Sequence, residues 1–240
     1  MDIYIDIREQ EGVRSMRFES SCVQGAMRLD RPDELVLEYT RAMMTPLLLR
    51  DGDFPQRVLL IGLGAGSMVR FLYRHFPSAH LTTVEIEPAV VEAAKLHFFL
   101  PDDQERLHLV VGDGVAFMLE TTESYDLILV DGFNQHAHPG ELNSLAFYRA
   151  CRDRLAPNGM LAVNLIGLSD KYKGGLVYVE EAFDGSVLRL PRCRSGNTIA
   201  VAVRDGLSSI PSMPELRLRV AKMIQRTALD LGAFINTLEV

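Results

Sequence analysis

The sequence predicts an α/β protein, in which a mostly parallel, doubly wound sheet follows a small N-terminal antiparallel β meander. From residue 57 onward, short continuous apolar runs alternate with helical patterns, which is typical of parallel strands covered by helices on both faces. Before residue 30, apolar and polar residues alternate in short runs, which is typical of antiparallel strands with one solvated face.

The predicted elements follow in order along the chain. Residues 2–29 are expected to form the meander and residues 31–49 a helix with acidic residues in its first turn. The segment 50–56 ("RDGDFPQ") is rich in turn residues and is the best candidate for a boundary. It divides the chain into residues 1–50, the meander plus helix, and residues 51–240, the larger domain.

The larger domain contains the alternating strands and helices. Strands are expected at residues 57–62, 80–86, 107–113, 125–131 and 159–167, with helices between them at 66–76, 87–98, 114–122 and 143–156. A helix near 170–184, a strand pair at 186–191 and 197–203, and a helix from about Pro214 complete the chain.

Composition excludes several classes of function. The net charge of −7 and the absence of a basic block disfavour nucleic-acid and acidic-membrane partners. The three cysteines are far apart and form no C-x-x-C, which favours a reduced compartment. The chain shows no leader pattern and no apolar run long enough to span a membrane. We therefore expect a soluble, cytoplasmic protein.

A glycine-rich turn links the first apolar strand of the larger domain to a helix. Gly62, Gly64 and Gly66 form G-x-G-x-G, which lets a ligand approach the backbone at a helix N-terminus. The turn lacks the Lys-Ser/Thr of a phosphate-binding loop, and the missing helical glycine argues against NAD. A tight turn that binds nothing is the structural alternative.

Acidic residues end the next two strands. Glu85 lies about twenty residues beyond the glycines, where a carboxylate can accept the hydroxyls of a ribose. Glu87 competes for this role, but it is more simply a charge at a helix start. Asp113 and Gly114 could contact an adenine, although Asp113 could equally cap the following helix. A ribose and a base without a pyrophosphate indicate an adenosine-containing sulfonium compound.

Asp131 ends the fourth apolar run and begins the polar loop "GFNQHAHPGELNS". This strand-end position favours a catalytic base, while a hydrogen bond to the loop backbone is the structural alternative. His136 and His138 form H-x-H in the same loop, but only Glu141 accompanies them at ligand spacing. We therefore predict no metal site.

Several stretches resemble the spermidine/spermine synthase (polyamine aminopropyltransferase) family, in particular its divergent bacterial spermidine synthase-like branch. They are "VQGAMRLDRPDELVLEYTRAM", "RVLLIGLGAGSM", "VEIEPAVVEAA", "VVGDGVAFM", "YDLILVDGF" and "LAPNGMLAVNL". The resemblance covers roughly residues 15–205. It implies a Rossmann-like methyltransferase fold, decarboxylated S-adenosylmethionine or S-adenosylmethionine as co-substrate, a small-molecule amine as acceptor, and a homodimer.

The resemblance also implies roles for individual residues. Asp131 would be the catalytic base that takes a proton from the acceptor amine. The residues implied to bind the donor are Gln24, Gly62, Gly64, Gly66, Glu85, Asp113 and Gly114, and Asn134 would contact the acceptor. Tyr39 lies one residue out of register with a family tyrosine and is assigned no role.

Three departures from the family pattern all concern the recognition of amines. Ala65 replaces an aspartate that holds the amine of the donor, Asn134 replaces an acceptor-binding aspartate, and Cys193 replaces a tyrosine of the acceptor channel. A partly desolvated cation needs carboxylates to offset its lost hydration. The residues implied to bind adenosine therefore match the family pattern, whereas the sequence does not identify the acceptor.

Three hypotheses follow. The first is an aminopropyltransferase-like enzyme that uses Asp131 as base. The second is an S-adenosylmethionine-dependent methyltransferase on the same scaffold, because loss of the aspartate at Ala65 makes room for the carboxylate of that donor. The third is a non-catalytic nucleoside-binding protein.

Overall fold

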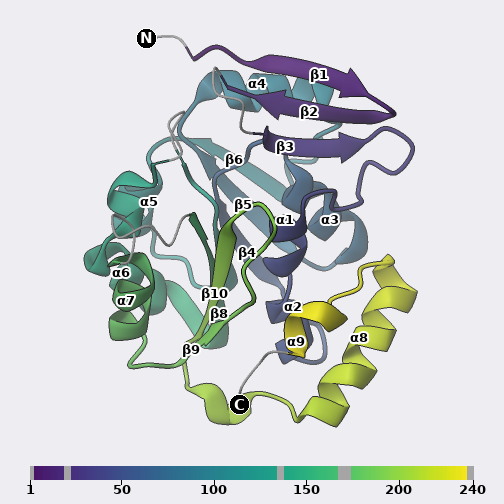
Figure 1. Ribbon diagram of the computed structural model, residues 1–240. Coiled ribbons are helices and arrows are strands. Elements are labelled where there is room, and N and C mark those ends of the chain that lie inside the picture. Colours follow the sequence, from purple (N-terminus) through teal and green to yellow (C-terminus); the bar gives the residue numbers. More distant parts are fainter. Residues whose placement is uncertain (1–2, 19–22, 134–137, 167–173, 237–240) are drawn as a thin grey trace.

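Two sheets organise the part of the chain that the structure describes, residues 3–18, 23–133, 138–166 and 174–236. In this computed structural model a seven-stranded sheet occupies the centre, and a three-stranded sheet lies across one end (Figure 1). This confirms the predicted fold class.

The predicted meander is confirmed. Strands β1 (Asp6–Gln10), β2 (Val13–Arg17) and β3 (Val23–Arg28) pair antiparallel in chain order. Its buried side chains, such as Met16 and Met27, join the same apolar cluster as strands of the large sheet. The meander therefore packs on the larger domain through a shared core.

The large sheet has the order β6-β5-β4-β7-β8-β10-β9. Strands β4 to β8 run parallel, whereas β10 pairs antiparallel with both β8 and β9. The strands are β4 (Arg57–Ile61), β5 (His80–Glu85), β6 (Leu107–Val111), β7 (Tyr125–Val130), β8 (Leu155–Ile166), β9 (Val187–Arg189) and β10 (Asn197–Val203). Each of these strands lies where the sequence predicts one.

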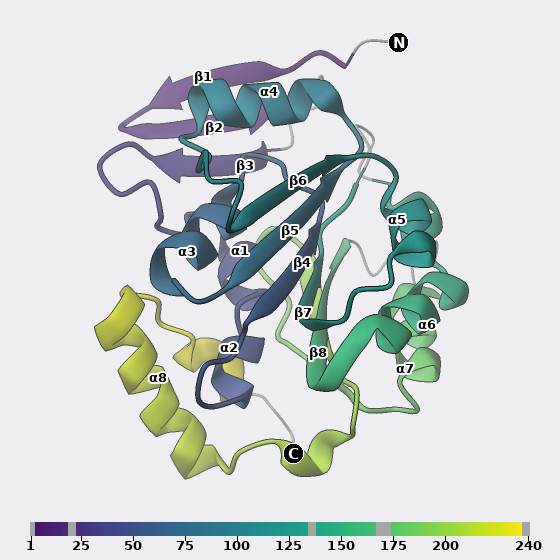
Figure 2. The same ribbon diagram turned by 180° about the vertical axis from the view of Figure 1, so that it is seen from behind.

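Helices cover both faces of this sheet (Figure 2). They are α3 (Ser67–His75), α4 (Pro88–His97), α5 (Gly114–Glu120), α6 (Leu145–Arg154), α7 (Gly174–Ala182), α8 (Met213–Thr227) and α9 (Gly232–Ile235), with short 3₁₀ turns η1 (Gly140–Asn143) and η2 (Leu207–Ser209). Buried side chains of α3, α4 and α8 share one apolar cluster with the meander, and those of α5, α6 and α7 form a second.

The predicted helix over residues 31–49 is wrong in its extent. The structure has two short helices instead, α1 (Glu38–Ala42) and α2 (Pro46–Leu49). Pro46 has no backbone N–H and cannot continue α1, so it begins α2 in the first-turn position that proline tolerates.

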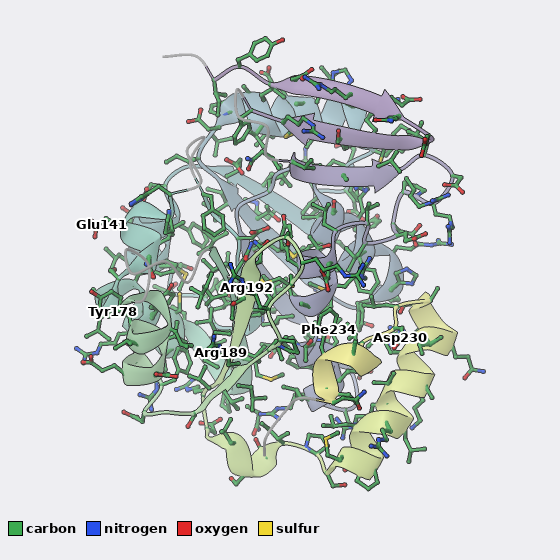
Figure 3. All side chains as sticks on the ribbon, viewed as in Figure 1. Glu141, Tyr178, Arg189, Arg192, Asp230 and Phe234 are labelled. Atoms are coloured by element: carbon green, nitrogen blue, oxygen red, sulfur yellow. The ribbon has the colours of Figure 1, made fainter. Side chains whose placement is uncertain are left out.

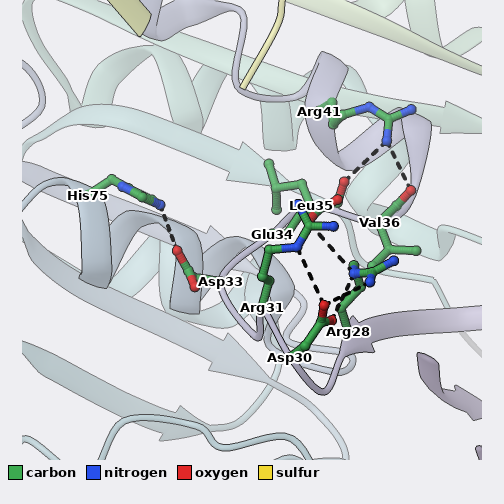
Figure 4. Close-up of polar contacts among 9 residues, drawn as sticks. All are labelled: Arg28, Asp30, Arg31, Asp33, Glu34, Leu35, Val36, Arg41 and His75. Atoms are coloured by element: carbon green, nitrogen blue, oxygen red, sulfur yellow. Dashed lines mark hydrogen bonds and ion pairs between the residues drawn. The ribbon is translucent and has the colours of Figure 1, made fainter. Parts of the chain in front are cut away.

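Side chains hold the segment before α1, in place of helical hydrogen bonds. Arg41 Nη1 donates to the carbonyl oxygens of Leu35, at 3.2 Å, and Val36, at 3.1 Å (Figure 4). The His75 ring pairs with Asp33 at 2.8 Å and ties the segment to α3. The backbone carbonyls thus find partners outside a helix, as buried carbonyls must.

The C-terminal helix α8 packs against α2. Asp230 and Phe234 mark the junction of α8 and α9 in Figure 3, and Arg192 marks the connection between β9 and β10. Phe234 is buried in the first apolar cluster. The helix α9 was not predicted, because its four residues are too few to show a helical period.

The glycine turn fits tightly between neighbouring strand ends. The N–H of Gly62 donates to the carbonyl of Val84 at 2.9 Å, and the N–H of Asp131 donates to the carbonyl of Ile61 at 2.8 Å. Gly62 has a φ of +96°, and a Cβ there would lie 2.4 Å from the carbonyl oxygen of Asp131. Only glycine therefore allows β4 to turn this close to β7.

We predict that Gly62→Ala destabilises the protein far more than Gly12→Ala. Both glycines have positive φ, but a Cβ at Gly12 would meet nothing within 4 Å. Gly12→Ala should cost about 1–2 kcal/mol of backbone strain. Gly62→Ala should cost a further ~1–3 kcal/mol, because the overlap displaces backbone. Urea unfolding of both variants measures the difference, and equal costs would contradict this account.

Candidate active site

The candidate site lies at the carboxyl ends of β4, β5, β6 and β7. Parallel strands bring these ends to one edge of the sheet, the usual ligand edge of such folds. The described residues singled out from the sequence lie at this edge or on β3 above it. The geometry thus gathers them, while their roles stay predictions.

Glu85 holds the glycine turn. One carboxylate oxygen accepts the N–H of Leu63 at 2.8 Å, and the other accepts the N–H of Glu87 at 3.0 Å. The side chain is buried, and this burial raises the pKa of Glu85, while the backbone donors oppose the rise. Glu85 therefore has a structural task at the position where the sequence predicts ribose binding.

Asp113 caps α5. Its Oδ1 accepts the N–H of Ala116 at 2.8 Å, so the helix-capping alternative raised from the sequence is confirmed. Gly114 packs against β4, because a Cβ there would lie 2.6 Å from the side chain of Ile61. Asp113 remains exposed, so capping leaves its other oxygen accessible to a ligand.

Strand β3 lies directly over the glycine turn. A Cβ at Gly64 would lie 2.9 Å from the carbonyl oxygen of Gln24, and Ser67 Oγ donates to the carbonyl of Ala26 at 2.8 Å. A Cβ at Gly25 would lie only 2.5 Å from the Cβ of Ala65. The meander thus brings the backbone of Gln24 to the turn, and the donor-binding role of this residue stays a prediction.

Asp131 is partly exposed, and its carboxylate faces polar groups from two other elements. Asn164 Nδ2, on β8, donates to Oδ1 at 2.7 Å. The Tyr39 hydroxyl, on α1, interacts with the same carboxylate. Burial raises the pKa of Asp131 to about 6, with a smaller contribution from the charge of Glu85, while Asn164 and Tyr39 oppose the rise. A carboxylate with this pKa is ionised at neutral pH and is a stronger base than an ordinary one.

Sequence reasoning missed Tyr39, Asn164 and Asn197. Tyr39 was left without a role because it lies one residue out of register with the tyrosine of the family pattern. Asn164 interrupts the apolar run of β8, and Asn197 opens that of β10. A polar residue within a buried strand needs a partner, and that signal could have singled out both asparagines.

The remaining candidates lie in the loop after Asp131 and in the connection between β9 and β10. Asn134 and His136 fall outside the described residues. His138 is exposed, and its Nδ1 accepts the N–H of Gly140 at 3.0 Å. Cys193 is buried near Glu38 and Arg41, and burial raises the pKa of its thiol to about 11. Among the described residues, no three His, Cys, Asp or Glu side chains come together as a metal site.

A pocket of about 350 Å³, open to solvent, lies behind the same loop, lined by Val130, Leu142, Tyr148 and Val163 among others. Val130 and Val163 face the second apolar cluster. Side chains alternate along a strand, so Asp131 and its neighbour Asn164 face the opposite side of the sheet. Asn164 and Gly132 nevertheless contribute to the lining of this pocket, so it lies next to the residues around Asp131.

Comparisons with known proteins identify the family of this chain. Residues 37–164 match the spermine/spermidine synthase domain. A polyamine aminopropyltransferase from Chromobacterium violaceum is 34% identical over 235 residues, which cover 98% of this chain and 89% of the relative. The chain belongs to the spermine/spermidine synthase family.

Solved structures extend the comparison of the fold. A probable spermidine synthase from Corynebacterium glutamicum matches 92% of this chain and 84% of its own, with 21% identity and a TM-score of 0.77. Human methyltransferase-like protein 13, solved in complex with SAH, matches 79% of this chain and 91% of its own, with 25% identity and a TM-score of 0.68. The synthase family and this methyltransferase thus share the fold.

We predict that Asp131→Asn stabilises this family member at neutral pH. The pKa of Asp131 is raised from 3.8 to about 6 on folding, so ionisation opposes folding increasingly as pH rises between these values. An asparagine keeps an oxygen for Asn164 without the charge. Allowing for partial exposure, we expect a gain of about 1–2 kcal/mol, or several degrees in Tm.

Thermal unfolding at pH 5 and pH 7 tests this prediction, with Asp113→Asn as the exposed control. The gain from Asp131→Asn should shrink toward pH 5, whereas the control should change little at either pH. A destabilised Asp131→Asn at pH 7 would show that the carboxylate contributes favourably to the fold.

Proposed function

We propose that this protein is an aminopropyltransferase, a transferase that moves an aminopropyl group from an S-adenosyl sulfonium donor to a small-molecule amine. The observation that carries the proposal is the Asp131 carboxylate, held at a strand end beside the glycine turn with a pKa of about 6. Family membership and the relatives named polyamine aminopropyltransferase support it.

We propose that the donor binds across the strand ends. Glu85 would face its ribose, Asp113 and Gly114 its adenine, and Gln24 the region of its sulfonium. Supporting this placement, Ile86, next to Glu85, is an apolar side chain with 57% exposure. An exposed apolar surface beside a ribose-binding carboxylate suits a base, which has apolar faces.

The chemistry follows from the charge states. The acceptor amine is protonated at pH 7 and has no lone pair for attack. Asp131 accepts one of its protons, and the freed lone pair forms the new N–C bond. The C–S bond breaks as its electron pair returns to sulfur, which gives a neutral thioether, 5'-methylthioadenosine. Because the sulfonium is already a good leaving group, positioning supplies most of the acceleration.

The proposal also concerns which donor the protein uses, decarboxylated S-adenosylmethionine or S-adenosylmethionine. Ala65 is buried and places no carboxylate at the amine end of the donor. This observation favours a second candidate, transfer of a methyl group from S-adenosylmethionine, whose carboxylate would be repelled by an acid at this position. The fold shared with human methyltransferase-like protein 13 is compatible with that candidate.

Product analysis distinguishes the two functions. We expect 5'-methylthioadenosine when the protein is incubated with decarboxylated S-adenosylmethionine and a panel of diamines. Formation of S-adenosylhomocysteine from S-adenosylmethionine would support the methyltransferase instead. Calorimetric binding of either donor without any product would favour a non-catalytic nucleoside-binding protein.

We predict that Asp131→Asn lowers kcat by ~10²–10⁴-fold, the usual contribution of a general base. Binding of the donor, measured by calorimetry, should change little. In the unaltered enzyme, kcat/KM should fall as pH drops below about 6, because Asp131 becomes protonated.

Asp126→Asn is the matched control for that prediction. Asp126 lies at the other end of β7, where its carboxylate accepts the N–H groups of Gln56 and Arg57. Its replacement should leave kcat and the pH profile unchanged. Full activity in Asp131→Asn would exclude Asp131 as the base.

Three expectations from the sequence stay predictions: the homodimer, the cytoplasmic location and the division of the chain near residue 50. Of the helices in the described segments, none is long and apolar enough to cross a membrane.

A further inference from the structure

Three neighbouring strands place polar side chains in a row at the candidate site. Val130 pairs with Val163, so Asp131 and Asn164 are the next residues along β7 and β8. Asn164 pairs with Ile199 on β10, two residues beyond Asn197. By the alternation of side chains, all three polar residues face the side of the sheet that carries Tyr39.

Hydrogen bonds join this row into a chain. Ser195 Oγ donates to Asn197 Oδ1 at 2.6 Å, Asn197 Nδ2 donates to Asn164 Oδ1 at 2.9 Å, and Asn164 Nδ2 donates to Asp131 Oδ1 at 2.7 Å. Asn164 is 4% exposed and Asn197 7% exposed, so water contributes little to their hydrogen bonding.

The carboxylate fixes the direction of every bond in the chain. An ionised carboxylate only accepts, so Asn164 must present its NH₂ group to Asp131. The oxygen of Asn164 must then accept from Asn197, whose own oxygen accepts from Ser195. Turning over Asn164 would break both of its hydrogen bonds, and turning over Asn197 would break its bond to Asn164, because only the Ser195 hydroxyl can exchange donor and acceptor roles.

We propose that Asn164 and Asn197 are positioning residues for the transfer reaction, forming an amide relay that holds Asp131 Oδ1 and so orients the carboxylate that accepts the proton of the substrate amine. The relay rests on the proposed role of Asp131 as base. It does two things: it sets the plane of the carboxylate, and it stabilises the ionised form against burial.

The relay acts with two other groups that face Asp131. Tyr39 from α1 also favours the ionised carboxylate, whereas the charge of Glu85 from β5 disfavours it. Removing the donor at Asn164 should therefore raise the pKa of Asp131 further. A hydrogen bond to a charged group contributes about 1.5–3 kcal/mol, which corresponds to a shift of about 1–2 pH units.

The test compares pH profiles of kcat/KM for Asn164→Ala, Asn197→Ala and the unaltered enzyme. Asn164→Ala should move the acidic limb upward by about 1–2 pH units and lower kcat at pH 7 by at least tenfold. Asn197→Ala should cause a smaller shift in the same direction, because it acts through Asn164. Calorimetric affinity for decarboxylated S-adenosylmethionine should stay within about twofold of the unaltered enzyme.

Thr198→Val is the matched control. Thr198 follows Asn197 on β10, is buried, and faces the opposite side of the sheet. Thr198→Val should change neither kcat nor the position of the acidic limb in the pH profile of kcat/KM. If Asn164→Ala folds poorly, Asn164→Leu combined with Asn197→Leu removes both amides together, so that neither amide is left without the other.

Double variants distinguish failure of the relay from failure of the proposed base. If both hold, adding Asn164→Ala to Asp131→Asn causes little further loss of kcat, because residues that act as a unit are not additive. If Asp131→Asn is inactive but Asn164→Ala leaves the acidic limb of the kcat/KM profile unshifted, the relay alone is overturned. Full activity in Asp131→Asn overturns the base, and the relay with it.

Discussion

The fit of the glycine turn among the ends of β5, β4 and β7 is the constraint on which the rest of the structure depends. Gly62 touches the backbone of Asp131, and Glu85 holds the N–H of Leu63 from the other side. Strand β3 then closes over the turn through Gly25. One tight connection thus fixes the spacing between the proposed donor-binding groups and the proposed base.

Burial determines the pKa of the proposed base, Asp131. A carboxylate surrounded by protein loses hydration, and Asp131 accordingly has a pKa of about 6, at a cost in folding free energy near neutral pH. The two buried asparagines and Tyr39 limit this cost without neutralising the charge. A lysine or arginine beside Asp131 would lower its pKa further and weaken it as a base. Neutral donors therefore suit a group that must be ionised and still accept a proton.

The sequence was enough to predict features that depend on neighbouring residues along the chain. Apolar runs located the strands, and parallel pairing alone brought Glu85, Asp113 and Asp131 to one edge. It did not suffice for contacts that depend on register between strands, such as Asn164 with Asn197, or on the break between α1 and α2. Arg41 binds the carbonyls before α1, a contact between side chain and backbone that a helical pattern does not reveal.

The packing of Ala65 ties the glycine turn to the meander. Its Cβ and the backbone of Gly25 leave no space between the turn and β3. A carboxylate at residue 65 would have to enter this contact or displace β3, which also carries Gln24. Ala65 is thus part of the way the meander seats on the turn, and reversing it alone would not recreate an open acidic pocket. The turn and the meander therefore have to be considered together when residue 65 is altered.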